Sequence, residues 1–462
     1  MTRPKVFIEK IMPVKLLNEQ VYYEHGGNPF KGLHRWYSRK PLSFSRATVL
    51  ASILPYDITT EQFLYIMGIY GQDDVNFWEK SILSEDEKDL LRNNKQVRLY
   101  KCPPNHQQIS KMEELCQSIW GTTKPSILDA FAGGGSIPFE ALRYGLNVFA
   151  SDLNPVAVIT MKAAMEYPLK FGKSLQKEID QWVNFVGNEA QKRLTDFFPN
   201  NDNETVQNYL WAHTVTCPNC QSVIPLSPNW WVDRSPGAIK KGQICAVKPI
   251  PNVLEKRVDF ELIKGSKGKG NTIKTETEEF DPNNYTTIGR GVGKCCNCAK
   301  IIEDDYIKKE AQTKGLGHQL YAVAFKQGKG SLEFRLPNEI DLEGVNKAEQ
   351  FLQDNLEKYN LDQLIPDIEI ISGEKTKELI RIGIEKWSQL FNSRQLLTLV
   401  TYVEIINDAK LKILAEYELE KAQAIITYLA LVLDRCVDKN ARLTIWDASA
   451  IKVNRATTQH SL

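Results

Sequence analysis

The feature that most constrains how this chain can fold is a run of three glycines directly after a short apolar segment. The run reads Ser126-Ile-Leu-Asp129-Ala-Phe131-Ala-Gly133-Gly134-Gly135-Ser136-Ile-Pro138. The apolar residues predict a strand, and Ser136 and Pro138 are typical of the start of a helix, with Ser136 as N-cap. Glycines between the two allow positive φ angles and let a ligand approach the backbone closely. We therefore expect a strand, a tight turn and a helix, with a ligand at the turn.

A second predicted strand, Asn147–Ser151, leads to Asp152, about twenty residues after the turn. A carboxylate at this place in a βαβ unit can accept hydrogen bonds from both ribose hydroxyls of a nucleoside. The glycine spacing is not the G-x-G-x-x-G of dinucleotide enzymes, and the turn has no Lys to balance a pyrophosphate. With acids at Asp129 and Asp152, the site suits a cationic ligand with an amino group, such as S-adenosylmethionine. The alternative is a tight turn in an ordinary α/β sheet.

These residues resemble a known family. Phe131-x-Gly133-x-Gly135 is similar to the F-x-G-x-G cofactor motif of amino-methyltransferases that act on DNA. The longer strings resemble the N-terminal part of the zinc-ribbon-containing adenine-specific DNA methylases, prokaryotic proteins associated with restriction-modification and phage defence. These strings are the glycine run, Ser151-Asp152-Leu-Asn154-Pro155 and His34-Arg-Trp-Tyr-Ser-Arg-Lys-Pro41.

The resemblance implies that Phe131 packs beside the cofactor, that Gly133 and Gly135 line its methionine part, and that Asp152 holds the ribose. The full set of cofactor-binding residues that it implies is Asp129, Phe131, Gly133, Gly134, Gly135, Asp152 and Asn154.

Two C-x-x-C pairs, Cys217-Pro-Asn-Cys220 and Cys295-Cys296-Asn-Cys298, indicate a metal site. Two residues between thiolates let both sulfurs face one tetrahedral Zn²⁺. A single pair can be redox-active, but two pairs in one region favour a structural Cys₄ zinc ribbon with ligands Cys217, Cys220, Cys295 and Cys298. Cys296 is an alternative to Cys295. The long separation between the pairs is consistent with a loop insertion, because loop-closure entropy grows slowly with length.

Arg35, Arg39 and Lys40 flank Trp36 and Tyr37 in the basic opening of the chain. Such a patch can grip phosphates and stack an unpaired base. In the resembled family a segment before the glycine strand also helps to hold the methionine carboxylate, a role that Arg39 or Lys40 can fill. The alternative is the end of an amphipathic helix with the two rings in the core.

We therefore expect an α/β fold: a Rossmann-like, S-adenosylmethionine-dependent methyltransferase sheet, itself incomplete, with a helical N-terminal segment, an inserted Cys₄ zinc ribbon and a C-terminal helical region. Part of the insertion, Lys/Gly-rich at Gly265–Gly270 and acidic at Glu276–Asp281, is expected to be a mobile loop. The expected segments are 1–120 (mainly helical), 121–210 (cofactor-binding α/β unit), 211–340 (zinc ribbon with insertion), 341–438 (helical) and 439–462 (a strand and the chain end).

The 462 residues contain no stretch of roughly 20 apolar residues and no apolar signal at the start. We expect a cytoplasmic protein with reduced thiols and no membrane partner. The net charge of +1 excludes no class of binding partner. Residues 1–55 and 234–274, however, carry local surpluses of basic residues that can face phosphates.

The base-holding motif of adenine-N6 transfer is missing from this chain. In the resembled family an Asp/Asn/Ser-Pro-Pro-aromatic tetrapeptide does this work, beyond the part that this chain resembles. The nearest strings, none of which fits, are Cys102-Pro-Pro-Asn105, Ser227-Pro-Asn-Trp230 and Asp281-Pro-Asn-Asn-Tyr285. The catalytic residues are thus unknown, and we expect a second polypeptide to supply the tetrapeptide; truncation is the alternative.

The expected function is therefore the S-adenosylmethionine-binding part of a DNA adenine-N6 methyltransferase, inactive alone. Two alternatives stay open: a non-catalytic zinc-ribbon subunit that binds nucleic acid or regulates, and an RNA methyltransferase.

Overall fold

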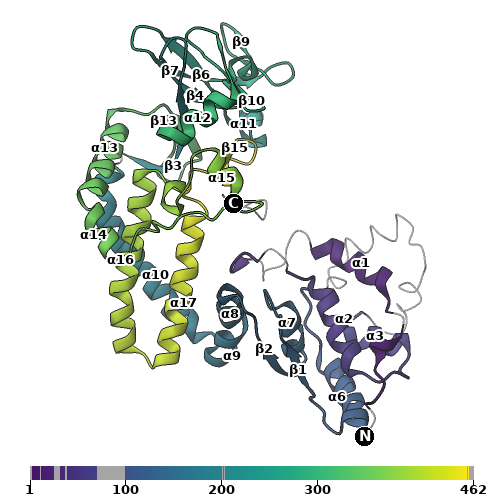
Figure 1. Ribbon diagram of the computed structural model, residues 1–462. Coiled ribbons are helices and arrows are strands. Elements are labelled where there is room, and N and C mark those ends of the chain that lie inside the picture. The colour runs from purple at the N-terminus through teal and green to yellow at the C-terminus, as the bar shows by residue number, and fades with distance from the viewer. Residues whose placement is uncertain are drawn as a thin grey trace. The chain divides into compact units, whose positions relative to one another are not determined.

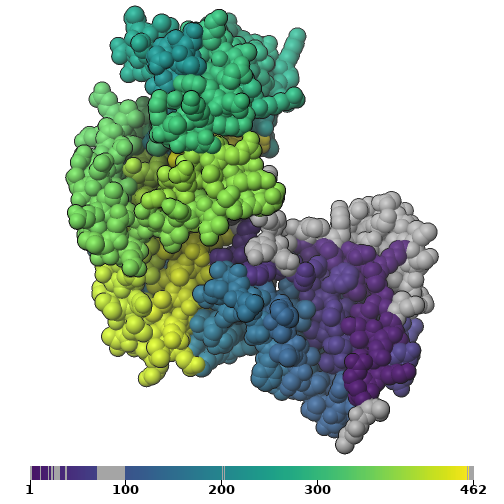
Figure 2. All heavy atoms as spheres, in the orientation of Figure 1, coloured from purple at the N-terminus to yellow at the C-terminus, as the bar shows by residue number. Residues whose placement is uncertain are grey.

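The computed structural model describes residues 3–10, 12–24, 32–36, 39–69, 99–199, 201, 203–454 and 456. The chain divides into two compact units, which Figure 1 draws as ribbons and Figure 2 as atoms. Unit 1 contains Met1–Asp180 and Glu416–Leu431, and unit 2 contains Gln181–Ala415 and Val432–Leu462. Helices and strands are mixed, so the predicted α/β class is confirmed at that level.

Unit 1 begins with helices whose ends follow local sequence signals. Helix α6 is capped by a reciprocal pair, in which Asn105 accepts from the backbone of Gln108 and Gln108 from that of Asn105, and it ends at Gly121 with φ 69°. The described helices before the glycine run are η1 (Phe7–Glu9), α1 (Val14–Tyr23), α2 (Leu42–Ile53), α3 (Thr60–Met67) and α6 (His106–Trp120).

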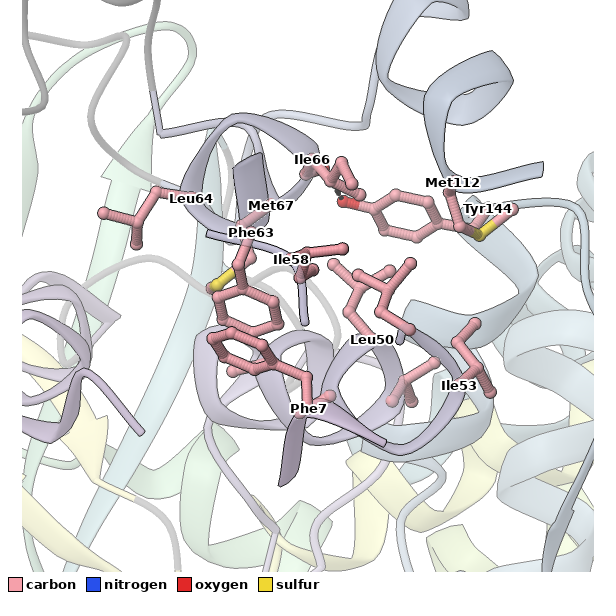
Figure 3. Packing of buried hydrophobic residues seen from close by; sticks show 14 of the residues in the cluster. Phe7, Leu50, Ile53, Ile58, Phe63, Leu64, Ile66, Met67, Met112 and Tyr144 are labelled. Atoms are coloured by element: carbon pink, nitrogen blue, oxygen red, sulfur yellow. Dashed lines mark hydrogen bonds between the residues drawn. The ribbon is translucent and has the colours of Figure 1, made fainter. Parts of the chain in front are cut away.

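These helices enclose one hydrophobic core with helix α7 (Ser136–Arg143) (Figure 3). The rings of Phe7 and Phe63 stack with their centroids 4.2 Å apart. Tyr144, which follows α7, is wholly buried and donates its hydroxyl to the carbonyl of Ile66 at 2.7 Å. The N-terminal helices and the helix after the glycine run are therefore one folded body.

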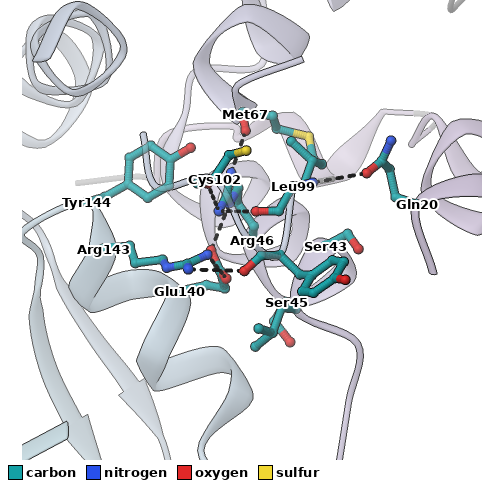
Figure 4. Close-up of polar contacts among 12 residues, drawn as sticks. Gln20, Ser43, Ser45, Arg46, Met67, Leu99, Cys102, Glu140, Arg143 and Tyr144 are labelled. Carbon is teal, nitrogen blue, oxygen red and sulfur yellow. Dashed lines mark hydrogen bonds and ion pairs between the residues drawn. The ribbon is translucent and has the colours of Figure 1, made fainter. Parts of the chain in front are cut away.

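A buried ion pair also joins α2 to α7 (Figure 4). Arg46 on α2 donates Nε to Glu140 on α7 at 2.7 Å, and both side chains are almost completely buried. Arg46 also donates to the carbonyls of Met67, Leu99 and Cys102. The pair fixes the helix that begins at the glycine turn.

The predicted strand–turn–helix–strand unit is present. Strands β1 (Ser126–Asp129) and β2 (Asn147–Ala150) pair in parallel, with Leu128 opposite Phe149, and α7 connects them. Among the described residues the parallel sheet has only these two strands, so no complete Rossmann sheet is shown. The elements that follow are α8 (Pro155–Met161), η5 (Lys162–Glu166), α9 (Tyr167–Phe171), α10 (Ser174–Leu194) and η6 (Thr195–Phe197).

Unit 2 is built on two antiparallel sheets. The first has the order β14-β13-β3-β4, and the second has the order β5-β6-β7-β8-β9. Trp230 is completely buried in the core that the two sheets share. Their strands are β3 (Glu204–Thr216), β4 (Val223–Leu226), β5 (Trp231–Asp233), β6 (Ile244–Asn252), β7 (Arg257–Lys267), β8 (Ile273–Lys274), β9 (Glu279–Phe280), β13 (Gly317–Gln327) and β14 (Leu332–Arg335).

The second sheet contradicts the expectation of a mobile loop. Much of Gly265–Gly270 and Glu276–Asp281 lies in or beside strands β7 to β9. The hairpin closes because Ile273 and Phe280, which pair across β8 and β9, are both buried while their charged neighbours face water.

The other described elements of unit 2 are a small three-stranded sheet, β10-β11-β12, a strand pair, β15-β16, and helices. The short strands are β10 (Ile288–Gly289), β11 (Val292–Lys294), β12 (Ile301–Ile302), β15 (Ile445–Asp447) and β16 (Lys452–Asn454). The helices are α11 (Pro236–Lys241), η7 (Pro282–Tyr285), α12 (Asp304–Lys314), α13 (Glu339–Asp354), α14 (Leu356–Leu361), α15 (Lys377–Arg381), η8 (Trp387–Leu390), α16 (Ser393–Glu416) and α17 (Leu419–Val437). Residues 419–431 of α17 belong to unit 1. None of the helices in the described part of the chain has the length and apolar character needed to cross a membrane.

Candidate functional site

Four cysteines come together in unit 2. The sulfur atoms of Cys217, Cys220, Cys295 and Cys298 all lie within 4.8 Å of one another. Sγ of Cys217 is 3.8 Å from that of Cys298, and Sγ of Cys220 is 3.5 Å from that of Cys295. Ligands about 2.3 Å from a tetrahedral Zn²⁺ stand about 3.8 Å apart, so these four thiols can hold a metal ion.

The two cysteine turns have the same backbone geometry. The amide of Gln221 donates to the carbonyl of Cys217 and the amide of Ala299 to that of Cys295, each at 3.0 Å. Both donors have positive φ, 61° and 57°. The first turn follows β3 and the second follows β11, so distant parts of the sequence supply matching halves of one site.

The neighbouring cysteines do not belong to the cluster. Cys296 adjoins Cys295 but is not one of the four clustered sulfurs, and burial raises the pKa of its thiol to about 11. Cys245 is buried in the core under the second sheet. The site thus uses Cys295, the first of the two adjacent cysteines. Burial disfavours the thiolate of Cys220, but hydrogen bonding with Ser222 and with other cysteines lowers its pKa to about 6.

The glycine turn of unit 1 has the conformation that its sequence requires. Gly133 and Gly135 have φ angles of 51° and 78°, which residues with a side chain rarely adopt. Gly135, and not Ser136, is the N-cap of α7, which corrects the prediction from sequence. The hydroxyl of Ser136 is buried and has no hydrogen-bond partner in the described part of the chain. A buried donor of this kind beside a turn is a group that a bound ligand can satisfy.

Asp152 holds the turn from the end of β2. Its Oδ2 accepts from the amide of Gly133 at 2.8 Å, and its Oδ1 accepts from the amide of Asn154 at 2.8 Å. Asn154 caps α8 by accepting from the amide of Val156. Asp129, at the end of β1, accepts from the amide of Phe131 at 3.2 Å. The two acids expected from the sequence therefore lie at the same edge of the parallel pair.

The basic N-terminal segment reaches this turn. A Cβ atom added at Gly133 would lie 2.8 Å from Nε1 of Trp36, and one added at Gly134 would lie 3.1 Å from Nε of Arg39. Burial lowers the pKa of Arg39 to about 10. Arg35 is half-buried and Lys40 is exposed, whereas Tyr37 lies outside the described residues. Arg39 is thus the cation that the fold brings to the glycines, a placement that sequence spacing alone did not establish.

One face of the parallel pair is apolar and exposed. Ile127 and Val148 pack against the core of unit 1, while Leu128 and Phe149 on the opposite face are 73% and 63% exposed. Phe131 in the turn is 85% exposed. Phe131 therefore does not contribute to the core described above.

The three strings closest to the missing tetrapeptide have structural roles. Asn105 caps α6, Trp230 fills the core and donates its ring nitrogen to the carbonyl of Tyr285, and Asp281 caps η7. None of these strings fits the expected tetrapeptide, and each contributes a helix cap or a core residue.

Comparison with known proteins adds one finding. Residues 11–64 match the family described as "Protein of unknown function (DUF1156)". The matched segment contains Trp36, Arg39 and Arg46, which lie against the glycine turn and α7. No curated protein and no solved structure matches the chain.

Proposed function

We propose that this chain is the S-adenosylmethionine-binding part of a DNA adenine-N6 methyltransferase from a restriction or phage-defence system, completed by a second polypeptide. The observation that carries the proposal is the turn Gly133–Gly135 between β1 and α7, with Asp152 at the end of the neighbouring parallel strand. Ligands of α/β sheets bind at the carboxyl ends of the strands, where this turn lies.

The side chains around the turn fit the parts of this cofactor. Asp152 is an acceptor for the ribose hydroxyls, because each carboxylate oxygen has a further lone pair besides its bond to a backbone amide. Arg39 is a cation for the methionine carboxylate, and the hydroxyl of Ser136 is a spare donor. The cofactor would supply an electrophilic methyl group. The chain's own work is to bind and orient it.

The exposed apolar face supports a second polypeptide. A two-stranded sheet is marginally stable alone, and parallel sheets are normally covered on both faces. Leu128 and Phe149 form an uncovered apolar pair opposite the packed face. We infer that further strands and helices of the partner cover this pair and bring the tetrapeptide that holds the target adenine.

The metal at the four cysteines is proposed to be Zn²⁺ with a structural role. A site closed by four thiolates has no open position for substrate or water. Its function is to hold the two cysteine turns together.

Cofactor binding is tested by thermal unfolding of the full chain with and without S-adenosylmethionine. Saturation at 100 times Kd should stabilise unit 1 by about 2.7 kcal/mol. Asp152→Asn keeps an acceptor for Gly133 but loses the charge, and should remove most of this stabilisation. Asp447→Asn is the control in unit 2, where Asp447 accepts from two backbone amides through its Oδ1 alone. An equal response to the cofactor in both variants would refute the assignment of Asp152.

Methyl transfer is tested with tritiated cofactor, the chain, and a candidate partner that carries the tetrapeptide. We expect label in DNA only when both polypeptides are present. The same experiment is repeated with RNA of the same sequence. Label in RNA but not in DNA would show that RNA is the substrate. Cofactor binding without transfer in any combination would favour a regulatory module.

A further inference from the structure

A cavity of about 370 Å³ lies within unit 2, between the first sheet, the start of α16 and the segment 441–453. Its size is within the range of small-molecule sites, roughly 300–1,000 Å³. The cavity is separate from the cysteine cluster and from the glycine turn, because it includes none of their residues. Nothing described above gives it a role.

Five aromatic residues are among those that line the cavity. They come from β3, β5, β13 and the C-terminal segment, and they are Tyr209, Trp211, Trp231, Tyr321 and Trp446. Trp211 lies edge-on to His318, with the ring centroids 5.6 Å apart. Rings of this kind provide flat surfaces on which a planar ligand can stack.

Arg394 packs on two of these rings. Its guanidinium carbon lies 3.8 Å from the ring centroid of Tyr209 and 5.9 Å from that of Trp211. The side chain of Arg394 is buried and also donates to the carbonyl of Phe197. A ring that is already fixed loses little conformational entropy when a ligand stacks on it.

The polar groups of the cavity favour an anionic or neutral ligand. Among the described residues that line it, Arg442 alone carries a charge. Nη2 of Arg442 donates to Nδ1 of His213 at 3.4 Å, which places the proton of this imidazole on Nε2. Nε of Arg442 is buried and has no hydrogen-bond partner among the described residues. Asn392 and Gln395 add side-chain amides, of which only the oxygens are used in capping α16.

We propose that this cavity binds one unstacked base of a single-stranded nucleic acid, with the adjacent phosphate at Arg442. Aromatic residues, amides for base edges, a cation and the absence of carboxylates from the part of the lining that the structure describes together match the chemistry of a nucleotide. A duplex keeps its bases stacked and cannot fill the cavity without unpairing one. The proposal goes beyond the cofactor site and does not depend on it.

Binding is measured by fluorescence anisotropy of the full chain with a labelled 12-nucleotide single strand, without cofactor. The assay is repeated with three other labelled ligands: the same sequence as a duplex, the same sequence as RNA, and an acidic peptide of equal charge. We expect the single strands to bind more tightly than the duplex and the peptide. Trp211→Leu should weaken single-strand binding by roughly 5- to 150-fold, whereas Phe351→Leu, at an exposed ring on α13, should not change it.

A charge insertion keeps the proposal testable if Trp211→Leu disturbs β3. Gln395→Glu preserves the acceptor that caps α16, because Glu serves equally well at this position of a capping box. It places a negative charge in the cavity lining and should weaken binding by about tenfold. Gln353→Glu is the matched control, since it adds the same charge at an exposed position of α13.

Equal binding by Gln395→Glu and by the unchanged chain, or tighter binding of the duplex or the peptide, would overturn the proposal. Asp152→Asn should leave single-strand binding unchanged. The two assays therefore distinguish a failure of the proposed cofactor site from a failure of the proposed base-binding cavity.

Discussion

Replacement of either partner of the buried pair Arg46–Glu140 should destabilise unit 1, and the two replacements should differ in size. Glu140→Gln keeps an acceptor for Nε of Arg46 but leaves the guanidinium without its counter-charge. The remaining partners of Arg46 are the carbonyls of Met67, Leu99 and Cys102. Both side chains are no more than 1% exposed. Removing one partner of such a pair costs about 3–5 kcal/mol, and we expect the lower end, about 3 kcal/mol.

Arg46→Met should cost more. Glu140 would keep Arg143, which donates to it at 2.9 Å, so its charge would not be isolated. However, the buried carbonyl of Met67 would lose its donor at a cost of about 1–3 kcal/mol, and Leu99 and Cys102 would each lose one hydrogen bond, although Leu99 keeps the amide of Cys102. The lost packing of the long side chain and the lost charge beside Glu140 add to this cost. Burial opposes the charge on Arg46, but Tyr144 and Glu140 together raise its pKa, so this residue remains a cation in the folded protein.

The measurement is urea unfolding followed by circular dichroism, combined with hydrogen exchange of α7. We expect earlier unfolding in the order unchanged chain, Glu140→Gln, Arg46→Met, with faster exchange across residues 136–143. Lys111→Met is the control, because Lys111 forms an exposed pair with Glu114 on α6. The reasoning is refuted if Arg46→Met costs no more than this surface control, or less than Glu140→Gln.

Three further predictions concern unit 2. The purified chain should contain one Zn²⁺ by metal analysis, and Cys295→Ser should lose it while Cys296→Ser retains it, because only Cys295 lies in the four-sulfur cluster; equal metal content in both variants would contradict the site. Ala299→Gly should raise the free energy of unfolding by about 0.5–1 kcal/mol in urea titrations, since Ala299 has φ 57°. Burial, with Arg442 and His318 nearby, lowers the pKa of His213 to about 4. Below about pH 6.5 this imidazole is protonated in the unfolded chain but stays neutral in the folded chain. The free energy of unfolding should therefore fall as the pH decreases from 6.5 to 4, and His213→Gln should reduce this dependence on pH.

Local chemistry explains what the sequence could predict. The elements around Gly133–Gly135 follow from apolar runs and glycines that lie within a few residues of one another. The two cysteine pairs carry their own ligand spacing, so their partnership across the insertion was predictable. The choice of Cys295 over Cys296 as ligand followed from the same spacing. Two residues separate Cys295 from Cys298, and a C-x-x-C spacing lets both sulfurs face one ion.

Other features depend on contacts that no local pattern contains. Arg46 and Glu140 are 94 positions apart, and their partnership exists only after α2 and α7 pack together. The N-cap at Gly135 was missed because a left-handed residue replaces the usual Ser cap. The strands of the insertion were not predicted from the sequence. Each of β8 and β9 has only one buried apolar residue, Ile273 or Phe280, and the surrounding lysines and glycines hide this pattern. The S-adenosylmethionine assignment stays a prediction.

The long spacer between the cysteine turns has a consequence for how this protein can vary. Trp230 is completely buried where the sheet of the spacer meets the sheet that contains β3 and β13. A shorter spacer would keep the metal ligands but would expose the apolar face of β3 and β13 that packs around Trp230. An exposed apolar face of this kind promotes association with other apolar surfaces. Substitutions and length changes should therefore accumulate at the hairpin tips of the spacer, whereas excision of the whole spacer should yield an insoluble chain.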